Sequence, residues 1–220
     1  MAQPPVDTAR ETAERARLTF RRLSGLDRSG PPPPETRAGE PWHVWTVPNA
    51  IGLVRLALIP VFIVTAVVSD TGTDGLPALL FAVVAWSDYA DGIAARVTGQ
   101  YSRFGALLDP IVDRLLIISG VAVCWYHDLL PRWALAVLVA RELFTLAAGR
   151  AALNRGAELD INWWGRLAVW PVMGAIFAGL VGLETTAAVL LYVGVAMALV
   201  ATSLYTRSVL RQLRRPRGTP

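Results

Sequence analysis

Six apolar stretches, each close to the length that crosses a lipid bilayer, follow one another between Asn49 and Tyr205. They run over residues 49–69, 76–96, 104–126, 133–153, 167–183 and 187–205, and about 20 residues of helix span a bilayer core. Hydrophobic residues make up 54% of the chain, which is too apolar for an ordinary soluble domain. Because backbone polar groups in lipid must find partners within the segment, the stretches predict an all-α, polytopic membrane protein with six transmembrane helices.

Polar segments flank this region. Residues 1–40 are rich in Arg, Glu, Pro and Gly and contain the run Pro31–Pro34, so we expect a disordered or weakly helical cytoplasmic tail. Trp42 and Trp45 have interfacial spacing, which predicts a short interfacial helix over residues 41–47. The chain thus divides into the tail, a membrane domain over 41–206 and a basic cytoplasmic tail over 207–220.

The placement of arginine predicts the orientation. The chain has no Lys, and its formal net charge is +4. If the N-terminus is cytoplasmic, most of the Arg residues that flank the stretches lie in the inner connections and the C-terminal tail. The outer connections then contain a single arginine, Arg132. This agrees with the positive-inside rule and places both termini in the cytoplasm. The arginines flank apolar stretches, so the charge suits anionic lipid headgroups rather than nucleic acid.

Four aspartates lie in or beside the second and third stretches: Asp88, Asp91, Asp109 and Asp113. Spacings of three and four residues put each pair on one helical face, and a turn over residues 97–102 would bring the two pairs together. Charges in apolar sequence are costly and mark function. Carboxylates without nearby His or Cys favour magnesium, calcium or manganese, so we expect a divalent-cation site that also meets a phosphate. The structural alternative is an ion-pair cluster with Arg96, Arg103 and Arg114.

The pattern Asp88-x2-Asp91-Gly92-x2-Ala95-Arg96-x8-Gly105-x3-Asp109-x3-Asp113 resembles the signature of the CDP-alcohol phosphatidyltransferase family. Thr46–Asn49 and Arg55 resemble the start of the first helix in that family. The resemblance implies an enzyme of phospholipid synthesis. Such an enzyme transfers a phosphatidyl group from CDP-diacylglycerol to an alcohol and releases CMP.

The resemblance also implies roles for individual residues. Asp88, Asp91, Asp109 and Asp113 would bind Mg²⁺ or Mn²⁺, with two ions expected, and Asp113 would also be the catalytic base. The CDP group would be bound by Asn49, Asp91, Gly92, Arg96 and Gly105. The protein would lie in the bacterial cytoplasmic membrane among membrane lipids, with its active site on the cytoplasmic side. Family members often form homodimers, so a homodimer is an assembly to test.

Four arginines, Arg141, Arg150, Arg155 and Arg166, are the candidates for binding the acceptor. The resemblance favours glycerol 3-phosphate, which would make the chain a phosphatidylglycerophosphate synthase. The alternative is a CMP-forming cardiolipin synthase, whose acceptor is phosphatidylglycerol, or another CDP-alcohol phosphotransferase. Gly165-Arg166 departs from the Gly-Lys that the family places after this loop. A membrane prenyltransferase and a cation-coupled transporter are more distant alternatives, and neither should release CMP.

Overall fold

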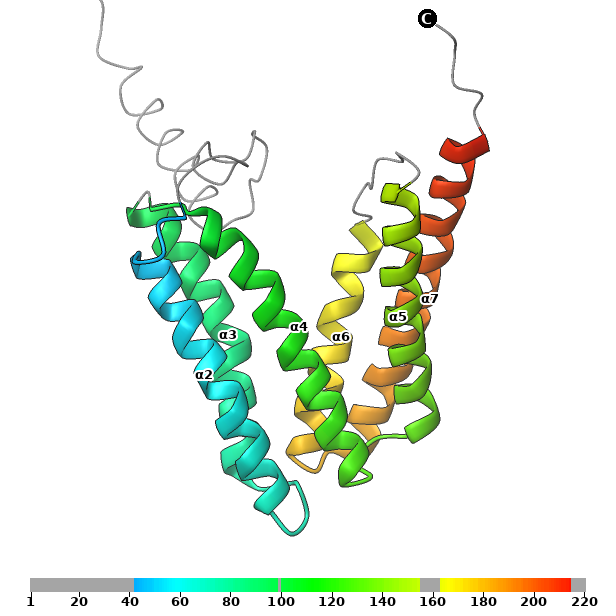
Figure 1. Ribbon diagram of the computed structural model, residues 1–220. Coiled ribbons are helices and arrows are strands. Elements are labelled where there is room, and N and C mark those ends of the chain that lie inside the picture. Colours follow the sequence, from blue (N-terminus) through cyan, green and yellow to red (C-terminus); the bar gives the residue numbers. More distant parts are fainter. Residues whose placement is uncertain (1–41, 99, 155–162, 215–220) are drawn as a thin grey trace, which may run out of the picture. The chain divides into compact units, whose positions relative to one another are not determined.

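The computed structural model describes residues 42–98, 100–154 and 163–214 (Figure 1). These residues form six helices and no strand: α2 (Val47–Val68), α3 (Gly75–Thr98), α4 (Arg103–Tyr126), α5 (Arg132–Asn154), α6 (Trp163–Leu180) and α7 (Glu184–Arg214). The prediction of an all-α fold is therefore confirmed for the described residues. The predicted tail over 1–40 lies outside them.

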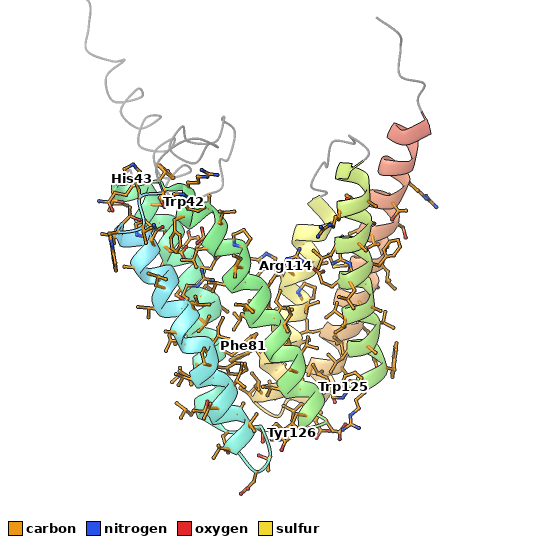
Figure 2. All side chains as sticks on the ribbon, viewed as in Figure 1. Trp42, His43, Phe81, Arg114, Trp125 and Tyr126 are labelled. Atoms are coloured by element: carbon orange, nitrogen blue, oxygen red, sulfur yellow. The ribbon has the colours of Figure 1, made fainter. Side chains whose placement is uncertain are left out.

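The interfacial helix predicted over residues 41–47 is wrong, because residues 42–46 are not helical and α2 begins at Val47. Thr46 caps α2, since its Oγ1 accepts a hydrogen bond from the backbone N–H of Asn49 at 3.4 Å. Pro48, in the first turn, has no N–H to leave unpaired. The Asn49 side chain donates to the carbonyls of His43 and Val44, both at 2.9 Å, and holds the preceding non-helical segment against the start of α2. Figure 2 shows Trp42 and His43 beside this start of α2.

The other helices follow the predicted stretches closely at most ends. The turn expected over 97–102 is present, because α3 ends at Thr98 and α4 begins at Arg103. α6 ends three residues earlier than predicted, at Leu180, where Gly182 adopts a φ of 77° and the Leu183 N–H donates to the Ala178 carbonyl at 2.8 Å. α7 continues to Arg214, so much of the predicted basic tail is helical.

Three helical segments are long and apolar enough to cross a membrane: Val47–Val68, Gly75–Ala95 and Glu184–Arg207. The apolar part of α6, Leu167–Leu180, is shorter than a full span. α4 and α5 carry charged residues along their length, including Asp109, Asp113, Arg141 and Glu142. The apolar helices indicate a membrane protein, with three candidate spans among the described residues.

The chain forms two compact units, which are described separately. The described part of unit 1 is residues 42–60 with Val83–Leu116, and unit 2 is Val61–Ala82 with the described residues from Ile117 onward. Unit 1 thus contains the first part of α2, the second part of α3 and the first part of α4, and it holds all four aspartates.

Unit 2 is built on apolar packing in which α7 lies against α6 and α5 (Figure 1). A Cβ atom at Gly194 of α7 would lie 2.7 Å from Cγ2 and 3.1 Å from the backbone nitrogen of Val172 on α6. Glycine at this position therefore lets the two helices approach closely. At another part of the unit, Phe62 and Phe81 are both buried, with ring centroids 5.6 Å apart.

Candidate active site

Arg55 lies at the centre of the charged cluster in unit 1. It is the only charged residue of α2, and only 1% of its surface is exposed. Its Nε donates to the backbone carbonyl of Val84 on α3 at 3.2 Å. This bond fixes the plane of the guanidinium group, so its two terminal nitrogens have defined directions.

Three aspartates converge on this guanidinium group. Nη1 lies 3.2 Å from Oδ1 of Asp88 and 2.8 Å from Oδ2 of Asp91, both on α3, while Nη2 lies 2.8 Å from Oδ1 of Asp113 on α4. Asp91 is nearly buried, but the side chains of Asp88 and Asp113 are 48% and 47% exposed. Arg55 therefore joins three helices through charge-assisted hydrogen bonds.

Asp109 lies nearer to an earlier turn of α2. A Cβ atom at Gly52 would lie 4.0 Å from Oδ1 of Asp109 and 2.8 Å from Cδ2 of Leu108. The absence of a side chain at Gly52 thus lets the first part of α4 approach α2. Asp109 is on the same helix as Asp113, one turn before it, as the spacing predicted.

Asn49 and Gly105, two of the predicted CDP-binding residues, lie against each other. The Ser102 hydroxyl donates to Oδ1 of Asn49 at 3.0 Å and accepts a hydrogen bond from the Gly105 N–H at 2.9 Å. A Cβ atom at Gly105 would lie only 2.5 Å from Oδ1 of Asn49. Gly105 thus makes room for a buried amide that ties α2 to α4, a role that its position in the motif did not predict.

A second contact closes the same end of unit 1. The Arg103 guanidinium lies over the Trp42 ring, 4.7 Å from its centroid, and the Phe104 N–H donates to the Trp42 carbonyl at 3.3 Å. Oε1 of Gln100 accepts a hydrogen bond from the Val47 N–H at 3.0 Å. The segment before α2 is therefore held against the start of α4.

The cluster contains oxygen ligands of the kind that bind divalent ions. The carboxylates of two helices point at one cationic group, and hard oxygen ligands suit Mg²⁺ or Mn²⁺. The cation they meet here is Arg55, however. No three acidic, His or Cys side chains of the described residues are arranged around one ion position. The carboxylate oxygens are therefore suitable ligands for such a metal, but in this structure they are arranged around a guanidinium group.

The predicted acceptor residues that the structure describes lie in unit 2. Nε of Arg141 donates to the Thr202 hydroxyl on α7 at 2.8 Å, and Nη1 donates to Glu142 at 2.8 Å. The Thr202 hydroxyl donates in turn to the Ala198 carbonyl at 2.9 Å. Arg141 therefore has protein partners on two helices, while Arg150 is exposed near the end of α5.

Other predicted residues are described only in part. Gly92 follows Asp91 on α3 and is partly buried. Arg96 lies on α3 and Arg166 on α6, but their side chains are outside the described part of the structure, as is Arg155 altogether.

The contacts of Arg55 were not predicted, although the residue was noted as part of the resemblance. A signal was present, because an arginine in the middle of an otherwise apolar helix needs a partner of opposite charge. Its partners lie 33, 36 and 58 residues away, so spacing along the sequence could not identify them.

Comparisons with known proteins agree with the motif. A protein of Streptomyces coelicolor named cardiolipin synthase (CMP-forming) is 35% identical over 137 residues, covering 60% of this chain and 64% of that protein. A Shigella flexneri protein named CDP-diacylglycerol–glycerol-3-phosphate 3-phosphatidyltransferase is 31% identical over 182 residues, covering 79% of this chain and 96% of its own length.

A Mycobacterium tuberculosis protein, whose name assigns it provisionally as a cardiolipin synthase, is 38% identical over 134 residues. The match spans only 62% of the mycobacterial protein. The model of the family described as CDP-alcohol phosphatidyltransferase matches residues 45–201, which include every residue of the charged cluster. Because this family model matches most of its length, the chain belongs to the CDP-alcohol phosphatidyltransferase family.

Proposed function

We propose that this protein transfers a phosphatidyl group from CDP-diacylglycerol to glycerol 3-phosphate and releases CMP. The observation that carries the proposal is the convergence of Asp88, Asp91 and Asp113 on one cationic centre, within a segment that matches the family model. The Shigella flexneri relative, which is matched over 96% of its length, is named for glycerol 3-phosphate. That match favours this acceptor.

The four aspartates would hold Mg²⁺ or Mn²⁺, with two ions expected. The bound metal would neutralise the pyrophosphate charge and stabilise the leaving CMP oxygen. Asp113 is suited to be the base, because its side chain is half exposed and it meets Arg55 through Oδ1. It would accept the proton of the acceptor hydroxyl as the new bond to phosphorus forms.

Other residues would bind the two substrates. Arg96 would pair with a phosphate of the CDP group, beside Gly92 and the amide of Asn49, with Gly105 keeping the backbone of α4 free of a side chain. The planar guanidinium group matches the geometry of a phosphate. The acceptor phosphate would therefore be bound by Arg141, Arg150, Arg155 and Arg166. Because Arg141 already has Thr202 and Glu142 as partners, its bonds would have to rearrange for that role.

The finer features of the membrane arrangement belong to the same proposal. All six helices would cross the bacterial cytoplasmic membrane, with α4 and α5 inserted through pairing of their charges. Both termini and the aspartates would face the cytoplasm, in accordance with the positive-inside rule. The working assembly would be a homodimer surrounded by membrane lipids.

A second candidate is cardiolipin synthesis, in which phosphatidylglycerol is the acceptor. The Streptomyces coelicolor relative carries that name and is 35% identical, slightly more than the Shigella flexneri protein. The two acceptors differ in size and in the presence of a terminal phosphate, so they can be separated directly.

The test is release of CMP by the purified protein in detergent, supplied with CDP-diacylglycerol and Mg²⁺ or Mn²⁺. Glycerol 3-phosphate and phosphatidylglycerol are added in separate reactions, with Asp113→Asn as the inactive control. CMP release that depends on glycerol 3-phosphate supports the proposal, and dependence on phosphatidylglycerol supports the second candidate. Folded protein that releases no CMP with either acceptor refutes both.

A further inference from the structure

We propose that Arg55 is a resident cation of the aspartate cluster, which competes with a divalent ion for the carboxylates. The inference rests on the proposed metal-dependent function. It assigns to Arg55 a positioning role, namely to hold the aspartates when no ion is bound and to set the affinity for the ion.

The cluster holds more negative than positive charge. Three carboxylates contact one guanidinium group, and the buried one, Asp91, would be costly without a cation. Without Arg55, Asp88, Asp91 and Asp113 would repel one another and push α3 away from α4. The structure therefore shows a cluster that holds together through a cation supplied by the protein itself.

Arg55 also fixes the positions of the carboxylates. The guanidinium group is anchored at its Nε by the Val84 carbonyl, and it spreads the carboxylates over two terminal nitrogens. In this arrangement no three acids of the described residues surround a single ion position. These three bonds use one oxygen of each carboxylate. Binding of one ion by all three carboxylates therefore turns them from their arrangement around Arg55 and weakens these bonds.

The charge of Arg55 also repels a metal ion. A divalent ion held by the same carboxylates would lie within a few ångströms of the guanidinium charge, where like charges repel strongly. Arg55 therefore opposes the ion twice, by occupying carboxylate oxygens and by its own charge. A different role, in which Arg55 orients the carboxylates for the metal, predicts the opposite effect of removing it.

The experiment uses the full-length protein in detergent and two readouts that do not depend on activity. Mn²⁺ affinity is measured by electron paramagnetic resonance, and the unfolding midpoint Tm is followed by tryptophan fluorescence with and without Mn²⁺. The variants are Arg55→Gln, which removes the charge, and Arg55→Lys, which keeps the charge but loses the planar fork. Arg132→Gln is the matched control, because Arg132 is exposed and pairs with Asp128 in unit 2.

The expected result for Arg55→Gln is a lower Tm without metal, Mn²⁺ binding that is about tenfold tighter, and a larger rise of Tm on adding Mn²⁺. Arg55→Lys should fall between wild type and Arg55→Gln in all three quantities, and Arg132→Gln should match wild type. If Arg55→Gln does not fold without Mn²⁺ but is rescued by it, the inference is supported through Arg55→Lys, whose Mn²⁺ affinity must still exceed that of wild type.

Weaker or unchanged Mn²⁺ binding in both Arg55 variants would overturn the inference, and so would a wild-type protein that binds no Mn²⁺. CMP release is not part of the readout. A wild-type protein that binds Mn²⁺ in competition with Arg55 but releases no CMP would refute the proposed function and still support this inference.

Discussion

The two units differ in the kind of residues that they bury. The buried polar residues of unit 1 are Asn49, Arg55, Asp91 and Ser102, and their bonds connect α2 with α3 and α4. The buried residues of the described part of unit 2 are mainly apolar and include small residues such as Ala175 and Ala187, and α7 approaches α6 closely at Gly194. One unit is specified by directional polar bonds and the other by close packing.

The buried charges of unit 1 have an energetic cost that the apolar packing of unit 2 does not have. Within lipid, apolar side chains gain little by leaving one apolar environment for another, so helices such as α6 and α7 depend on fitting closely. A buried ion pair costs desolvation and often stabilises no more than apolar packing would. The proposed role in binding would therefore explain the charged interior of unit 1 better than a role in stability alone.

The strongest test of this contrast is Asp113→Asn. The amide oxygen can still accept the hydrogen bond from Arg55, but the side chain can no longer act as a base. We expect CMP release to fall by about 10²–10⁴-fold, while Tm changes by only a few degrees. If both activity and Tm collapse together, Asp113 is part of the scaffold and the contrast fails.

Asn49→Asp should cause the largest loss of stability. A carboxylate cannot donate to the part-buried carbonyls of His43 and Val44, and losing each of these hydrogen bonds costs about 0.5–1.5 kcal/mol. The matched control is Gln100→Glu, because the Gln100 side chain accepts its bond from Val47 and a carboxylate can do the same. Denaturation followed by circular dichroism in mixed micelles would measure both, and equal losses in the two variants would contradict the assignment.

A pair of glycines probes the packing of unit 2. Gly194→Ala should destabilise the protein by about 1–3 kcal/mol through overpacking against Val172. At Gly179 the nearest atoms to an added Cβ are 3.6–3.8 Å away, so Gly179→Ala should be neutral or stabilise by up to about 1 kcal/mol. The same denaturation measurement applies, and a destabilising Gly179→Ala would show that α6 is packed more tightly than described.

Arg132→Gln should have the smallest effect. The Arg132 and Asp128 side chains are 52% and 66% exposed, and such a pair contributes roughly 0.2–1 kcal/mol. We expect unchanged CMP release and a Tm within the error of wild type. A clear loss of stability would mean that a surface ion pair in unit 2 matters as much as the buried one in unit 1.

Much of the fold could be predicted from the sequence, because hydropathy and turn residues mark the helices directly. The α3–α4 turn and the two aspartate pairs follow from local spacing. The bonds of Arg55 and the contact between Asn49 and Gly105 could not be predicted, since they depend on how three helices pack. The interfacial helix was wrong because the Asn49 amide binds the carbonyls of residues 43 and 44 in a non-helical segment, a contact that tryptophan spacing does not reveal.

The position of Arg55 also has a consequence for how the protein is made. α2 carries a full charge and is still apolar enough to enter a bilayer alone, whereas α4, with Asp109 and Asp113, does not meet that criterion. Synthesis delivers α2 first, so the guanidinium group that pairs with Asp113 is made before the aspartate. If both helices insert as proposed, the helix that can enter a bilayer alone precedes the helix that needs a partner.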